Sequence, residues 1–178
     1  MRRKWWVPLI AVCLFGIESI FNNYFPGHLI LQDGIFVPRF LFFLFIFISI
    51  FYDRNLGIYY AIGFGLVMDL VFTEILGIYL FWYPVIVYAI SKLMKVLHNH
   101  LFIVSLIFLL AVSLLEGGVY LFNYILQITN ITVQEFVNNR LFPTLLLNLC
   151  FYIIFSYPLK KYFMSIKKVK EEEEGMFQ

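Results

Sequence analysis

Three features of the sequence predict an all-α integral membrane protein: its composition, the length of its apolar runs and the lack of alternation within them. Hydrophobic residues make up 62% of the 178 positions and charged residues only 13%, whereas a water-soluble domain is about half apolar and about a quarter charged. Runs such as FLFFLFIFISIF do not alternate as the strands of a membrane barrel would. Open strands are excluded because lipid offers no partner for their backbone polar groups.

Six stretches are apolar enough for helices that cross a bilayer core of about 30 Å, which takes about 20 residues. They cover approximately residues 5–25, 36–52, 57–72, 75–91, 101–127 and 141–163. We therefore expect one six-helix transmembrane domain over residues 1–163. A charged cytoplasmic tail over residues 164–178 follows it, in which basic residues precede four glutamates.

The positions of Lys and Arg predict the orientation, because cytoplasmic loops retain these residues. With the N-terminus inside, eleven of the thirteen cations fall on the inner side and only two on the outer side. The inner cations are Arg2, Arg3, Lys4, Arg54, Lys92, Lys95, Lys160, Lys161, Lys167, Lys168 and Lys170, and the outer ones are Arg39 and Arg140. An even number of spans then places both termini in the cytoplasm.

Charged residues within the spans are the unusual feature of the chain. Glu18, Asp69 and Glu116 lie inside predicted helices, where an ionised side chain costs at least about 2.5–3.5 kcal/mol and so faces the bundle interior. At a rise of about 1.5 Å per residue, all three lie roughly 18–23 Å from the inner face. Arg39 and Arg140 approach the same depth from the outer side. We therefore predict one buried layer of three acids and two arginines.

Spacing along the chain suggests how this layer is paired. Arg39 follows Glu18 by 21 residues and Arg140 follows Glu116 by 24, so helices 1–2 and 5–6 resemble a parallel repeat. Two uses of the layer remain open. The acids could bind a proton, a cation or a cationic solute, as in transporters, or form interhelical ion pairs that fix helix order and register. Arginines at the same depth favour the ion pairs.

Small residues in the third predicted helix indicate close helix packing. Ala61 and Gly65 are four residues apart with Gly63 between them, and small residues at that spacing let helix backbones approach. We expect this set to serve packing within the protein, and a partner surface is the alternative.

No motif of enzymatic chemistry is present in the sequence. The chain lacks the phosphate-binding, dinucleotide-binding, nucleophile-elbow and zinc-helix patterns GxxxxGK[ST], GxGxxG, GxSxG and HExxH. Cys13 and Cys150 have no Cys or His at metal-ligand spacing. We predict no catalytic residue, no metal, no cofactor and no nucleic-acid partner.

Several short motifs resemble the rod shape-determining protein MreD family of the Gram-positive type, over about residues 1–168. Their order and spacing agree with six spans. They are Glu18-Ser19, VPRFL at 37–41, GFGLVMD at 63–69, Leu76-Gly77 with Tyr79, SKLMKVLH at 91–98, LLE at 114–116 and RLFPTLLLN at 140–148.

This resemblance implies a fold similar to the substrate-binding components of energy-coupling-factor transporters, and a non-enzymatic role in the bacterial cell membrane. The implied function is a scaffold of the cell-wall elongation complex that maintains rod shape. Its implied partners are the transmembrane helix and periplasmic-side region of MreC and, indirectly, the MreB filament and peptidoglycan synthases. Two alternatives remain: a substrate-capture subunit of an energy-coupling-factor-type transporter, and an enzyme of lipid or wall-precursor chemistry.

Overall fold

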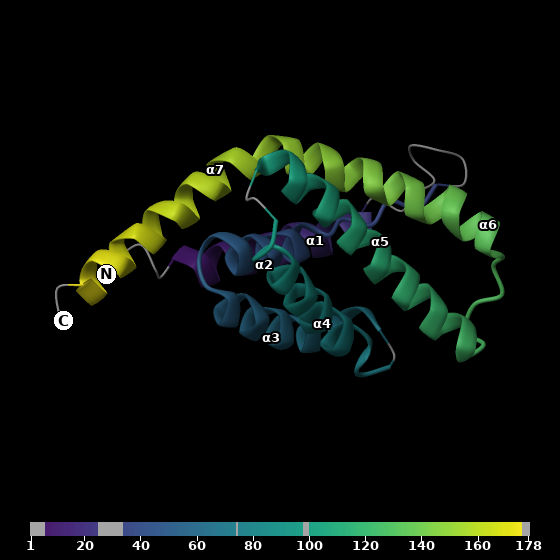
Figure 1. Cartoon of the computed structure of the whole chain (residues 1–178). Coiled ribbons are helices and arrows are strands. Elements are labelled where there is room, and N and C mark those ends of the chain that lie inside the picture. Colours follow the sequence, from purple (N-terminus) through teal and green to yellow (C-terminus); the bar gives the residue numbers. More distant parts are fainter. Residues whose placement is uncertain (1–5, 25–33, 74, 98–99, 176–178) are drawn as a thin grey trace.

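The structure is a computed structural model that describes residues 6–24, 34–73, 75–97 and 100–175. Within these ranges it is all-helical and contains no strand. The elements are α1 (Trp6–Tyr24), α2 (Phe40–Phe51), α3 (Arg54–Phe72), α4 (Ile78–Leu93), α5 (Leu101–Ile125), α6 (Val133–Phe136), the π-helical turn η3 (Val137–Leu141) and α7 (Phe142–Gly175). The start of α1 and the end of α7 lie at the same end of the molecule (Figure 1).

Four helical stretches of the described chain are long and apolar enough to cross a membrane. They are Trp6–Tyr24, Arg54–Phe72, Leu101–Ile125 and Val133–Glu172. Helices α2 and α4 are apolar but have only 12 and 16 residues, which correspond to about 18 Å and 24 Å. Six crossings therefore remain a prediction, and the two short helices must reach the bilayer surfaces with the help of other structure.

Two helix ends differ from the limits of the predicted spans. The second predicted span begins near residue 36, whereas residues 34–39 have no regular secondary structure and α2 begins at Phe40, because Pro38 restricts the residue before it to extended conformations. The last predicted span ends near residue 163, and α7 continues beyond it through the charged tail to Gly175. Lysines and glutamates are good helix formers, and Lys167 pairs with Glu171 one turn later at 3.9 Å.

Helix α2 is the centre of the bundle. Eleven of its 12 residues are buried, and it packs against α1, α3, α4 and α7. Its sequence contains a single polar residue, Ser49, as expected of a helix that is covered on all sides. The rings of Phe43 and Phe47 lie against Tyr152 of α7 with centroids 5.6 and 5.8 Å away. The aromatic run of this helix therefore forms the core rather than a lipid-facing surface.

Two glycines of α3 allow close helix contacts. A Cβ on Gly65 would lie 2.8 Å from the carbonyl oxygen of Tyr79 and 3.0 Å from Cα of Leu80, so α4 rests directly on this position. Gly57 makes the equivalent contact with α2, where an added Cβ would lie 2.7 Å from Cβ of Ser49. Ala61 is fully buried on the face of Gly65.

Gly63 does not belong to this packing face. A Cβ added there would meet nothing within 4 Å. Residues four apart share a helix face and residues two apart do not, so the expectation that Gly63 packs with Ala61 and Gly65 inside the protein is wrong.

We predict that Gly65→Ala destabilises the protein and that Gly63→Ala does not. The added methyl group at residue 65 must push the α4 backbone away, and overpacking of this kind costs about 1–3 kcal/mol. At residue 63 the methyl group has room and improves helix propensity. Thermal unfolding of both variants in the same detergent checks the difference, and equal midpoints would show that α3 and α4 are not in backbone contact at Gly65.

Candidate functional site

The polar centre of the bundle is an ion-pair triad on Glu116 of α5. Its Oε1 accepts a hydrogen bond from Nε of Arg39 at 2.7 Å, and its Oε2 accepts one from Nε of Arg140 at 2.9 Å. The three side chains come from the segment before α2, from α5 and from η3. Glu116 is fully buried and Arg39 is only 2% exposed, whereas the Arg140 side chain is 28% exposed. The triad therefore joins three distant parts of the chain, and of its members only Arg140 reaches the surface.

Arg39 is held by further contacts around its guanidinium. Its Nη2 donates a hydrogen bond to the hydroxyl oxygen of Tyr79 at 2.9 Å. The guanidinium carbon lies 5.0 Å from the centre of the Tyr79 ring, within the range of a cation–π contact. Because Tyr79 stands in the first turn of α4, the arginine connects this helix to the triad as well.

The extended segment before α2 is bound to α7 by polar groups at alternate residues. Thr144 and Asn148, one turn apart in α7, receive hydrogen bonds from the backbone N–H groups of Val37 at 3.2 Å and Arg39 at 2.8 Å. The Asn148 amide donates in return to the Val37 carbonyl at 2.9 Å. Non-helical backbone is tolerated at membrane depth when protein groups satisfy it in this way.

Asp69 caps a helix that is not its own. Its two carboxylate oxygens accept hydrogen bonds from three backbone N–H groups at the start of α4: Gly77 at 2.9 Å, Tyr79 at 2.8 Å and Leu80 at 2.9 Å. The first N–H groups of a helix have no partner within the helix, and a negative charge at that end is favoured by the helix dipole. Asp69 therefore stabilises the beginning of α4 from the end of α3.

Glu18 plays the corresponding part for α2. Its Oε2 accepts a hydrogen bond from the N–H of Leu41, in the first turn of α2, at 3.1 Å. Glu18 is fully buried, and its Oε1 has no hydrogen-bond partner among the described residues. The predicted pairing of Glu18 with Arg39 is wrong: within the described chain, Arg39 forms its ion pair with Glu116 instead.

The five charged residues singled out in the sequence thus divide into two kinds of interaction. Arg39, Glu116 and Arg140 form the triad, while Glu18 and Asp69 bind backbone N–H groups at helix starts. The prediction of a single ionic layer assumed that every buried acid has a cationic partner. It did not consider that helix N-termini also bind carboxylates.

Sequence reasoning did not select Tyr79, Thr144 and Asn148 as site residues. Thr144 and Asn148 are both fully buried, and they are four residues apart in an otherwise apolar run. Buried polar groups need hydrogen-bond partners, so two of them on one helix face were a usable signal. Tyr79 carried no such signal, because a tyrosine in an apolar helix is common at membrane interfaces.

No part of the described chain offers a metal site: no three His, Cys, Asp or Glu side chains within it lie together. Cys13 and Cys150 are both exposed on the outside of the bundle. The chemistry of the network is therefore that of ion pairing and helix capping.

We predict that Glu116→Ala destabilises the protein more than Arg140→Ala. Removing Glu116 leaves two cations without their carboxylate, one of them buried, and breaking a buried pair costs about 3–5 kcal/mol. Removing Arg140 leaves the Arg39–Glu116 pair intact, so we expect a loss of about 1–2 kcal/mol. Denaturant or thermal unfolding in detergent measures both. A reversed order would contradict the central position of Glu116 in the triad.

Comparison with known proteins shows the family. The model of "rod shape-determining protein MreD" matches residues 2–166. The chain is 34% identical over 171 residues to "Rod shape-determining protein MreD" of Bacillus subtilis (strain 168), a match that covers 96% of this chain and 99% of the relative. It is 26% identical over 158 residues to "Cell shape-determining protein MreD" of Streptococcus pneumoniae, covering 89% and 93%. No solved structure matches the chain. On this similarity over nearly its whole length, the chain belongs to the MreD family of cell shape-determining membrane proteins.

Proposed function

We propose that this chain is a non-catalytic scaffold of the bacterial cell-wall elongation complex. In this proposal it crosses the cell membrane six times with both termini in the cytoplasm. It binds the transmembrane helix and the periplasmic-side region of MreC, and through MreC it is linked to the MreB filament and the peptidoglycan synthases. The proposal starts from the role of the family in cell shape. Two features of the structure support a scaffold role.

The first supporting feature is that two of the three buried acids, Glu116 and Asp69, have both carboxylate oxygens bound within the chain. Both oxygens of Glu116 are engaged by arginines, and both oxygens of Asp69 are engaged by backbone N–H groups. Carboxylates bound in this way favour a structural role over the binding of a transported cation. This internal binding of Glu116 and Asp69 is the observation that carries the scaffold proposal, because it uses both acids to join helices of the bundle.

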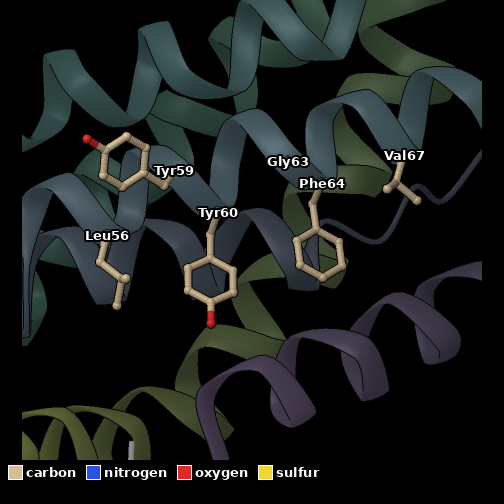
Figure 2. A pocket seen from close by; sticks show the side chains of 6 residues that line it. All are labelled: Leu56, Tyr59, Tyr60, Gly63, Phe64 and Val67. Carbon is tan, nitrogen blue, oxygen red and sulfur yellow. The ribbon is translucent and has the colours of Figure 1, made fainter. Parts of the chain in front are cut away.

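The second supporting feature is an apolar groove on α3, shown in Figure 2. It encloses about 430 Å³ and is lined by Leu56, Tyr59, Tyr60, Gly63, Phe64 and Val67. The side chains of Leu56, Tyr60 and Phe64 point from α3 toward α1 (Figure 2). The groove meets α1 at Phe64, whose ring centre lies 6.3 Å from that of Phe15. A groove with glycine in its wall suits a single apolar helix, and we place the MreC transmembrane helix there.

The alternative of a substrate-capture subunit requires a polar cavity of ligand size that opens to the outer side, which in this proposal is the side of the triad. The cavity beside the triad encloses about 180 Å³ and is lined by Asn22, Val37, Arg39, Met68, Phe72, Tyr79 and Arg140. Small-molecule sites usually enclose about 300–1,000 Å³. This cavity is therefore small for a vitamin-sized solute, which favours the scaffold.

We predict that Gly63→Leu weakens recovery of MreC with this chain, while Gly117→Leu does not. Both glycines lie in helices, and a Cβ at either one meets nothing within 4 Å, so both substitutions are compatible with the fold. The leucine side chain introduced at residue 63 occupies the groove, and a loss of about 1.4 kcal/mol lowers the affinity about tenfold. Co-purification of tagged chain with MreC measures the difference after each variant is shown to unfold at the wild-type temperature. Equal recovery with both variants would remove the groove from the interface.

A further inference from the structure

A second polar pocket lies at the end of the bundle opposite the triad. It encloses about 570 Å³ where α2 ends, α3 begins and α4 ends, with α7 along one side. Its polar walls are formed by the side chains of Ser49, Tyr52, Arg54, Ser91, Lys95 and Lys167. This is the end that carries most of the chain's lysines and arginines. The pocket takes no part in the scaffold function proposed above.

The pocket wall carries an excess of positive charge. Arg54, Lys95 and Lys167 line it, and no acidic residue of the described chain does. Lys167 has a partner in Glu171, but the contact is long at 3.9 Å and the Glu171 side chain is 63% exposed. Such surface pairs contribute little. The guanidinium carbon of Arg54 lies 4.5 Å from the centre of the Tyr88 ring, a cation–π contact that adds no negative charge. The positive charge of the pocket is therefore only weakly compensated by the side chains around it.

The nearest acid, Asp53, is already engaged elsewhere. Its Oδ1 accepts hydrogen bonds from the N–H groups of Asn55 at 2.9 Å and Leu56 at 3.1 Å, which cap α3. Its Oδ2 is bound by Nζ of Lys170 at 3.0 Å. Partial burial alone would raise the pKa of the Asp53 carboxyl, but these hydrogen bonds and the lysine hold its pKa below the ordinary value. Asp53 is therefore charged, and its carboxylate caps α3 and forms an ion pair with Lys170.

Two polar atoms in the pocket wall lack partners. The hydroxyl oxygen of Ser49 and Nε of Arg54 are buried and have no hydrogen-bond partner among the described residues. Ser49 itself is only 8% exposed. Buried polar groups are normally satisfied, and an unpaired one usually faces a bound molecule or water. A hydroxyl and a guanidinium N–H that line one pocket are both donors suited to phosphate oxygens.

The remaining walls are apolar and point to the source of the phosphate. Ile50, Met94 and Leu97 line the same cavity, and Leu97 is 37% exposed. An inorganic ion gains nothing from such walls, whereas the glycerol and upper acyl chains of a lipid do. Clusters of lysine and arginine at the ends of membrane helices are typical sites for anionic headgroups.

We propose that this pocket binds the phosphate group of an anionic phospholipid at the basic surface of the bundle. Arg54 and Ser49 donate hydrogen bonds to the phosphate oxygens, and Lys95 and Lys167 neutralise its charge. A lipid held here contacts the junction of α2 and α3 and the side of α7, and it thereby fixes the long C-terminal helix against the bundle.

Native mass spectrometry of the full-length chain in a neutral detergent tests this proposal, with phosphatidylglycerol as probe and phosphatidylcholine as reference. We expect wild-type protein to retain phosphatidylglycerol preferentially. The double variant Arg54→Gln/Lys95→Gln should retain about tenfold less, because charge-assisted hydrogen bonds are lost. The matched control is Lys161→Gln/Lys168→Gln, which removes the same charge from two exposed positions outside the pocket. It should behave as wild type.

Ser49→Ala provides a variant that does not alter charge or break an internal hydrogen bond. We expect it to lower retention by about threefold, the effect of one neutral hydrogen bond. Equal retention of the two lipids, or equal losses in the pocket and control double variants, would overturn the proposal. Full displacement of phosphatidylglycerol by millimolar inorganic phosphate would overturn the assignment to lipid.

Discussion

The first backbone N–H groups of a helix have no partner within it, and the architecture of this protein depends on how two apolar helix starts inside the bundle are satisfied. Helix α4 receives the carboxylate of Asp69, which binds three N–H groups at its start. Helix α2 receives that of Glu18. Because each cap comes from the preceding helix, capping also fixes which helix ends lie together. Without these contacts, two short apolar helices would leave buried N–H groups unpaired, each costing about 1–3 kcal/mol.

The triad on Glu116 connects further helices at the same end of the bundle. Arg39 immediately precedes the start of α2 and Arg140 lies in the π-helical turn before α7, so one buried carboxylate connects α5 to both. Thr144 and Asn148 pair with the extended segment between residues 34 and 39 as a neighbouring strand would. The segment and α2 together extend further than the helix alone, which is about 18 Å long. The paired polar groups at this end and the aromatic core around α2 together join α1, α2, α4, α5 and α7 into one bundle.

Much of this arrangement could be predicted from the sequence. Composition and apolar run length predicted an all-helical membrane fold, and the rarity of charge within the spans selected five residues as buried. Glu18, Arg39, Asp69 and Glu116 are buried, whereas the Arg140 side chain is 28% exposed. The partners of these residues could not be predicted in the same way. Spacing paired Glu18 with Arg39, yet three-dimensional packing brings Arg39 to Glu116. Which carboxylate meets a guanidinium and which meets a helix start depends on helix order and rotation. A single sequence with degenerate apolar faces does not specify these.

Residue-resolved hydrogen–deuterium exchange in lipid nanodiscs tests the central claim most directly, because it reports on the capped amides themselves. We expect the amides of Leu41, Tyr79 and Leu80 to be protected in the wild-type protein. Asp69→Ala should accelerate exchange at Tyr79 and Leu80 while leaving Leu41 protected, and Glu18→Ala should do the reverse. Rapid exchange at these amides in the wild type, or protection that neither substitution changes, would contradict capping of each helix by the acid of its neighbour.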